Sequence, residues 1–156
     1  MKLGEALTER AEAARRVEQL RARINGSARY QEGEQPPEDA AVLLTELDQV
    51  LDNLETLIRR INRTNATVPV DDIGTLTDAL ARRDVLRLRH AAVTAAADAA
   101  AGSGRGHLTR QLRSELKMLA ALPVAELRER ADRLAGELRQ LEVRIQRTNW
   151  EADLLD

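Results

Sequence analysis

The sequence predicts an all-α fold, an antiparallel four-helix bundle built from two duplicated long helical hairpins. Residues 43–61 and 127–145 carry the same apolar heptad spacing, 84 positions apart, and this repetition is typical of packed helices. The two runs also end in similar motifs, RINRTN and RIQRTN. Aromatic residues make up only 1% of the chain. The core must therefore be built from small and branched aliphatic side chains, which favours close helix packing over a sheet sandwich.

The repeated unit is a helix pair rather than one helix. The segment LGEALTER from Leu3 matches LTDALARR from Leu76, with an offset of 73 positions. The chain has 156 residues, a length that suits one compact domain. We therefore expect a single helical domain over residues 1–156, with an internal repeat of residues 1–65 and 75–153.

The heptads and helix-start signals predict the extent of each helix. Pro36 and Pro37, followed by two acids, are typical of a helix start. Thr75 with Asp78 predicts a capping box at the third helix. Short connections then join neighbouring helices as antiparallel pairs. We expect helices at about residues 2–27, 37–65, 75–101 and 124–153.

The connections within the two hairpins have opposite charge. The loop at residues 31–39 holds four acids and no base, whereas residues 105–117 are rich in bases. Apolar and polar residues alternate from residue 28 and from residue 115, so a short β ribbon could pair the two connections. The alternative is a helix that continues through residues 108–121.

Two arginines lie at equivalent places in the apolar stripes of the first and third helices. Arg10 and Arg83 could form interhelical pairs with Glu55 and Glu142, because a buried guanidinium without a partner is costly. Alternatively, the arginine stem lies flat while its head reaches water. A functional interpretation makes the two arginines an anion-binding pair.

The helix-end motif is the third candidate feature. Its amide side chains could cap the free carbonyls of the second and fourth helices, and the arginines beside them complement the helix dipole or could contact phosphate. Trp150 could cover the bundle end or anchor a partner. The motif residues are Asn62, Asn65, Gln146, Asn149 and Trp150.

Several classes of chemistry lack their sequence signals. The chain has no cysteine, only two histidines and a net charge of −2, so it offers no thiolate site and no overall basic field. The metal and phosphate motifs HExxH, Glu-x-x-His and the P-loop do not occur. We expect no cofactor and no metal site, although the sequence does not decide whether Asp71, Asp72 or the acidic loop binds a metal. Without a signal peptide or a membrane span, we expect a cytoplasmic protein.

Several short motifs together resemble a known group of proteins. They are MKLGEAL, QEGEQPPED, INRTN, TLTDALARRDVL, RSELK and the final TNW. The combination resembles an uncharacterised family of small bacterial proteins that are often labelled septicolysin, and the resemblance spans nearly the whole chain. It implies no particular chemistry, because that family has no established activity.

The function that we expect is a non-enzymatic helical scaffold that forms a homo-oligomer with no membrane span, and its protein partners are unknown. Leu44 and Leu51 lie beside the main heptad seam and leave apolar surface after one bundle has formed. The alternative is a nucleic-acid or anion-binding module, and a third hypothesis is an enzyme with carboxylate or arginine chemistry. The candidate nucleic-acid contacts are Arg105, Arg110, Arg113 and Lys117.

Overall fold

The computed structural model describes residues 1–103 and 116–156, which form four helices and one small two-stranded sheet. The elements in chain order are α1 (Leu3–Ser27), α2 (Ala40–Thr67), β1 (Pro69–Val70), β2 (Gly74–Thr75), α3 (Leu76–Ala100) and α4 (Val124–Glu151). The predicted all-α class, with four long helices in two antiparallel hairpins, is confirmed. The helix ends lie within a few residues of the predicted ranges.

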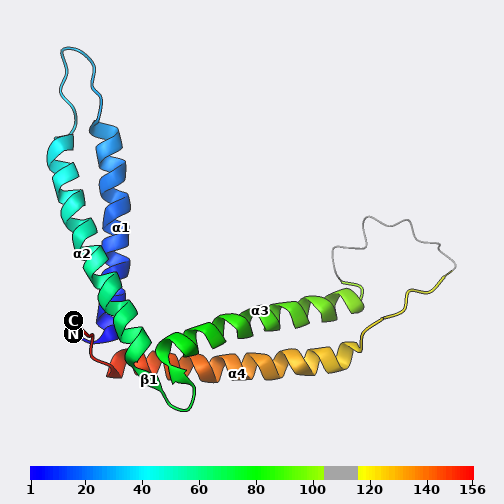
Figure 1. The fold of residues 1–156 in the computed structure, drawn as a ribbon. Helices are drawn as coiled ribbons and strands as arrows, with labels where there is room; N and C mark the ends of the chain where they lie inside the picture. Colours follow the sequence, from blue (N-terminus) through cyan, green and yellow to red (C-terminus); the bar gives the residue numbers. More distant parts are fainter. Residues whose placement is uncertain (104–115) are drawn as a thin grey trace. The chain divides into compact units, whose positions relative to one another are not determined.

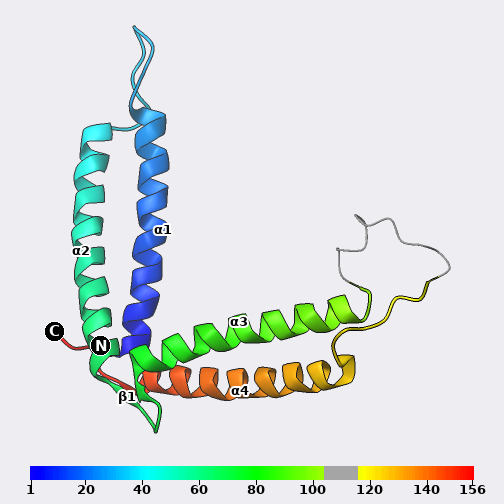
Figure 2. The ribbon, with the colours of Figure 1, turned by 45° about the vertical axis from the view of Figure 1, so that its right-hand side comes forward.

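The chain divides into two compact units. The first unit comprises residues 1–69 and 146–156, and the second comprises residues 70–145. In the first unit α1 and α2 lie side by side, and in the second unit α3 lies along α4, as both ribbon views show (Figure 1 and Figure 2). The boundary falls inside α4, so the last turn of this helix belongs to the first unit.

Both predicted heptad seams turn toward the partner helix of their own hairpin. Their residues are buried or half-buried at every position. In α2 the seam consists of Leu43, Leu47, Val50, Leu54, Leu57 and Ile61. In α4 it consists of Leu127, Ala131, Leu134, Leu138, Leu141 and Ile145. Burial of these aliphatic side chains is the main stabilising contribution in each hairpin.

Helix α3 begins at the predicted capping box. The Thr75 hydroxyl accepts a hydrogen bond from the Asp78 backbone N–H at 3.3 Å, and the Thr75 backbone N–H donates to Asp78 Oδ2 at 2.8 Å. Gly74 precedes the box with φ +121°, and a Cβ at this position would lie 2.6 Å from Asp78 Oδ2. Glycine therefore allows the carboxylate to close over the helix start.

Helix α2 begins three residues later than predicted, at Ala40 rather than residue 37. Asp39 is its N-cap and accepts hydrogen bonds from the backbone N–H groups of Ala41 at 2.9 Å and Val42 at 3.2 Å. A side-chain acceptor satisfies free N–H groups at the first turn, which a proline start would not do.

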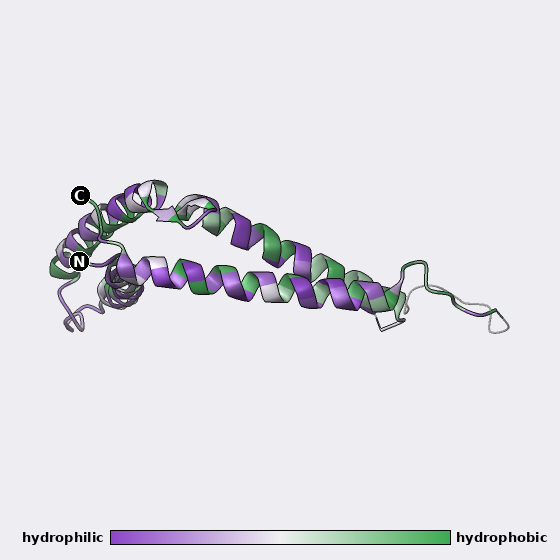
Figure 3. Cartoon of the chain, turned by 90° about the horizontal axis from the view of Figure 1, so that it is seen from below, coloured by the Kyte–Doolittle hydropathy of each residue, from purple (hydrophilic) through white to green (hydrophobic). Residues whose placement is uncertain are grey.

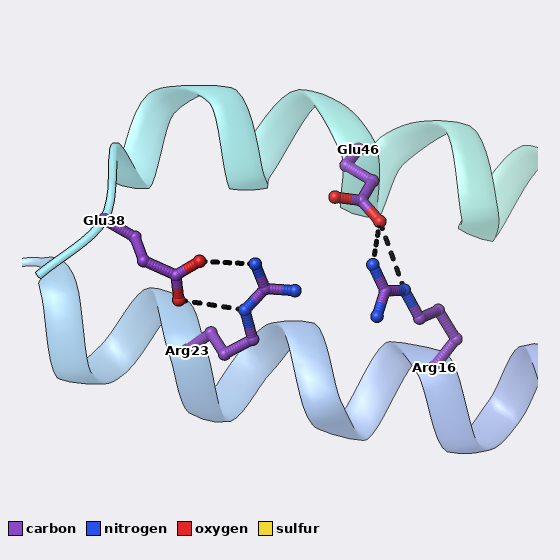
Figure 4. Close-up of polar contacts among 4 residues, drawn as sticks. All are labelled: Arg16, Arg23, Glu38 and Glu46. Atoms are coloured by element: carbon purple, nitrogen blue, oxygen red, sulfur yellow. Dashed lines mark hydrogen bonds and ion pairs between the residues drawn. The ribbon is translucent and has the colours of Figure 1, made fainter.

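Two ion pairs link α1 to the start of α2, as Figure 4 shows. Arg16 contacts Glu46 through two nitrogens, and Arg23 forms a two-bond contact with Glu38. The hydrogen bond from Arg23 holds the pKa of Glu38 below its usual value. These pairs fix the position of α1 along the axis of α2, near the connection between the two helices.

The predicted β ribbon is not formed by the described residues of the two connections. Residues 28–39 and 116–123 contain no strand, and residues 104–115 lie outside the described residues. Two adjacent prolines in the first connection lack the N–H groups that a ladder needs. The small sheet pairs β1 with β2, between α2 and α3. The alternative helix at 108–121 falls partly outside the described residues, and its last part, 116–121, is not helical.

Candidate interaction surface

The two arginines predicted to form buried interhelical pairs are placed differently in the structure. Arg10 is exposed rather than buried, which fits the alternative in which the arginine head reaches water. Arg83 is more covered, with 25% of its side chain exposed, and it binds its neighbour Asp84 at 2.8 Å. The nearby carboxylate satisfies Arg83 on its own helix, so the guanidinium does not need an interhelical partner.

The two predicted acidic partners bind other arginines. Glu55 lies 3.9 Å from Arg59, one turn further along α2. Glu142 of α4 binds Arg87 of α3 at 2.6 Å, which makes it an interhelical pair with a different arginine from the one predicted. Both glutamates are partly exposed, so these contacts contribute little to stability.

The helix-end motif lies in the last turns of α2 and α4, before the cap positions. Helix α2 continues to Thr67, beyond Asn65, and α4 continues to Glu151, beyond Asn149. Asn62 and Gln146 are exposed, Asn65 is half-buried and Asn149 is buried. The amide groups are therefore placed along the last turns of the helices rather than at the cap positions predicted for them.

Threonine is the member of the motif that sequence reasoning missed. Thr64 is fully buried, and its hydroxyl donates to the Arg60 carbonyl at 2.8 Å and accepts from the Leu155 N–H at 3.0 Å. The duplicate residue, Thr148, is also buried. Its occurrence in both copies of the RTN motif was the available sequence signal.

The arginines beside the motif hold the chain that follows α4. Arg60 Nε donates to the Leu155 carbonyl at 3.0 Å, and its guanidinium binds the Asp156 side chain at 2.9 Å. Arg63 donates to the backbone oxygen of Asp156. Lys2 adds an ion pair with Asp153 at 2.7 Å. These contacts attach residues 152–156 to α1 and α2.

Trp150 packs against the start of α1. A Cβ added at Gly4 would lie 3.0 Å from two atoms of the indole ring, so the ring lies directly on the α1 backbone. The other side of the tryptophan remains accessible, since 58% of the residue is exposed. Both predicted roles, covering the helix end and offering an anchor, are compatible with this placement.

The other predicted sites receive little structural support. Arg105, Arg110 and Arg113 lie outside the described residues, and Lys117 is exposed. Within residues 1–103 and 116–156, no three or more acidic or histidine side chains are grouped to hold a metal ion. Asp72 instead binds Arg144 at 3.1 Å. In the same part of the chain, no helix is long and apolar enough to span a membrane.

An exposed apolar stripe runs along α2, away from its own hairpin seam. Leu44, Leu51 and Ile58 recur every seven residues and are 48%, 41% and 38% exposed. We call these three residues the α2 stripe. Hydrophobic and hydrophilic residues alternate along the helices in Figure 3, as expected for amphipathic helices. Leu44 and Leu51 are the two residues predicted to leave apolar surface.

Helix α4 carries no equivalent stripe. The positions equivalent to Leu44 and Ile58 are Arg128 and Glu142 in α4, and the position equivalent to Leu51 is the small, half-buried Ala135. Arg128 binds Asp98 at 2.6 Å and Glu142 binds Arg87 at 2.6 Å. Both partners, Asp98 and Arg87, belong to α3. The same helix position thus serves interhelical ion pairs in one copy and exposed apolar surface in the other.

Comparison with known proteins supports a family without an assigned role. No curated protein matches the chain. A crystal structure of a functionally unknown conserved protein from Corynebacterium diphtheriae is similar, with 40% sequence identity, a TM-score of 0.87 and coverage of 99% of each chain. The resemblance to proteins labelled septicolysin receives no support from these comparisons. The model for a family of unknown function, DUF6847, matches residues 10–154, and the chain belongs to that family.

Proposed function

We propose that the protein is a non-enzymatic helical interaction protein that self-associates through the α2 stripe. The exposure of Leu44, Leu51 and Ile58 on one face of a well-formed helix is the observation that carries this proposal. Complete burial of a leucine or isoleucine side chain contributes about 1.5–3 kcal/mol relative to full exposure. Three partly exposed side chains in a row therefore favour a partner that covers them.

The duplicated helix provides an internal reference for this proposal. A hairpin of this kind is formed with Arg128 and Glu142 at the equivalent positions, so packing within the hairpin does not require leucine and isoleucine there. A hairpin of this kind thus does not depend on apolar side chains at these two positions. A second chain that covers the α2 stripe would explain why these residues are apolar.

The test measures molar mass by size-exclusion chromatography with light scattering at micromolar concentration. We expect the wild type to have a multiple of the 17.3 kDa chain mass. The double variant Leu44→Arg, Ile58→Glu, which copies the residues of α4, should return the monomer mass while keeping its far-UV circular dichroism. A matched control is Val143→Arg, because Val143 is exposed on α4 and its equivalent in α2 is Arg59.

The control variant should keep the wild-type mass. A monomeric wild type at these concentrations would refute self-association. An unchanged mass of the double variant would show that the α2 stripe does not form the contact. The nucleic-acid hypothesis predicts instead a salt-sensitive mobility shift with DNA or RNA, lost when Arg105, Arg110, Arg113 and Lys117 are neutralised.

A further inference from the structure

Helix α3 has an apolar face besides the one that packs in its own hairpin. Leu86, Val93 and Ala97 are buried, whereas six apolar residues on another face of the helix are all exposed. They recur at alternating steps of four and three residues, the spacing of a helix-packing seam. Val85 is 51% and Leu88 is 72% exposed. The α3 stripe consists of Ala81, Val85, Leu88, Ala92, Ala95 and Ala99.

The equivalent face of α1 is mostly polar. Shifting the α3 stripe by the 73-residue offset gives Glu12 in place of Val85 and Arg15 in place of Leu88. Thr8 and Gln19 replace two of the alanines. Because α1 forms the same kind of hairpin with these polar residues, the apolar character of the α3 stripe is not needed within a hairpin.

We infer that the α3 stripe of one copy binds the α2 stripe of a second copy, an inference that rests on the proposed self-association. The shapes are complementary, since α2 presents leucine and isoleucine and four of the six α3 positions are alanine. Large side chains on one helix pack into the grooves left by small ones on the other. The lengths also match, because the α2 stripe spans about 21 Å and the α3 stripe about 27 Å.

The charges beside the two stripes favour this pairing over two identical faces. Between Leu44 and Ile58, α2 carries acids and no base, and three of these acids are exposed: Asp48, Asp52 and Glu55. Arg82 and Arg89 are exposed along one side of the α3 stripe, and the acid on its other side, Asp84, is already paired with Arg83 on the same helix. Packing α2 against another α2 would bring the acids together, whereas α3 of the second copy places bases beside them.

The first test changes the α3 stripe to the residues of α1. The variant Val85→Glu, Leu88→Arg should weaken self-association by at least about 100-fold in the dissociation constant, as changes in the centre of an apolar interface do. Val143→Arg is again the control and should leave the constant unchanged. If the α3 variant associates as the wild type does while Leu44→Arg, Ile58→Glu is monomeric, this inference is wrong and the proposed function stands.

The second test uses the absence of cysteine from the chain. Differently tagged copies carrying Leu51→Cys and Leu88→Cys should form a disulfide between chains upon mild oxidation, and a Leu51→Cys copy with a Val143→Cys copy should not. Disulfides mainly between two Leu51→Cys chains would overturn the inference but not self-association. A monomeric wild type would overturn both. A chain that carries both Leu51→Cys and Leu88→Cys provides a further check. If it stays monomeric and forms the disulfide within itself, the two stripes cover each other in one chain, and both the inference and self-association are wrong.

Discussion

The two hairpins share their inner faces and differ on their outer faces. Leu3 and Leu76 are both buried at the helix starts, as are Ile61 and Ile145 near the helix ends. Outside the seams, the exposed apolar stripe lies on the second helix, α2, of the first hairpin but on the first helix, α3, of the second hairpin. The opposite helices, α1 and α4, are mostly polar at the corresponding positions, where only Ala22, Gly26 and Ala135 are not polar.

The comparison of the two hairpins separates the apolar residues that folding requires from those that an interaction would require. Positions that are apolar in both copies maintain the hairpin, because each copy must bury its own seam. Positions that are apolar in only one copy are dispensable for the hairpin. Where such positions form a continuous stripe, their apolar character is best explained by contacts made outside the hairpin, and the α2 and α3 stripes are the two such sets identified along these helices.

The largest expected difference concerns the helix starts. Gly4 of α1 lies under the Trp150 ring, whereas the equivalent residue of α3, Thr77, is exposed. A methyl group at residue 4 would lie only 3.0 Å from the indole and 3.2 Å from the Asn149 carbonyl oxygen, so these neighbours would have to shift by a few tenths of an ångström. Overpacking of this kind costs about 1–3 kcal/mol, more than the roughly 1 kcal/mol that alanine gains in helix propensity.

We therefore expect Gly4→Ala to lower the free energy of unfolding by up to about 2 kcal/mol in urea titrations. Thr77→Ala should change it by less than about 0.5 kcal/mol, as is usual at exposed positions. Equal effects of the two substitutions would contradict the close packing of Trp150 on α1 and leave the helix starts of the two copies equivalent.

A smaller effect on stability is expected when the two charged residues of α4 are changed to the leucine and isoleucine found at the equivalent positions of α2. The variant Arg128→Leu, Glu142→Ile removes two interhelical ion pairs with half-exposed partners, each worth about 0–1 kcal/mol. The free energy of unfolding should fall by less than about 1 kcal/mol. Self-association, measured by light scattering, should increase because α4 then carries an apolar stripe like that of α2.

The control for this variant is Arg133→Leu, which adds an apolar residue at an exposed place outside the equivalent stripe. It should leave the mass distribution unchanged. An unchanged mass of the double variant, with a loss of stability well above 1 kcal/mol, would mean that the ion pairs hold the second hairpin together. The outer positions would then contribute to folding in both copies.

The sequence predicted the parts of the fold that follow from periodicity. Heptad spacing and the internal repeat identified four helices and both seams, because burial along a helix has a fixed period. The capping box of Thr75 and Asp78 was also predictable, since its bonds join residues three positions apart. The start of α2 was misplaced because Asp39 caps the helix more effectively than the preceding prolines do.

The partners of charged and polar side chains were less predictable. The pairing of Glu142 with Arg87 rather than Arg83 depends on side-chain reach and on the competing acid at residue 84, which periodicity does not describe. The hydrogen bond from the Leu155 N–H to Thr64 joins residues far apart in sequence. Two residues of the α2 stripe, Leu44 and Leu51, were anticipated, whereas Ile58 and the α3 stripe emerged only when exposure was compared along the helices and between the two copies.

The smallest expected effect depends on pH and again compares the two helix starts. In the first copy the Lys2 backbone N–H donates to Glu5 at 2.7 Å, and in the second the Thr75 backbone N–H donates to Asp78. This backbone bond, with a further one from the Thr75 hydroxyl, lowers the pKa of Asp78. A lowered folded-state pKa stabilises the fold fully above the ordinary value of 3.8, and the contribution is lost as the pH falls through the lower folded-state pKa.

Asp78→Asn should therefore lower the midpoint of thermal unfolding slightly at neutral pH, and the difference from the wild type should shrink as the pH falls below 3.8. Asp132→Asn, at an exposed position of α4, provides the control and should not show this convergence. A difference for Asp78→Asn that stays constant down to low pH would show that the hydrogen-bond geometry, rather than the carboxylate charge, supports the start of α3. The second copy would then depend on its threonine cap, which has no equivalent at Lys2 in the first.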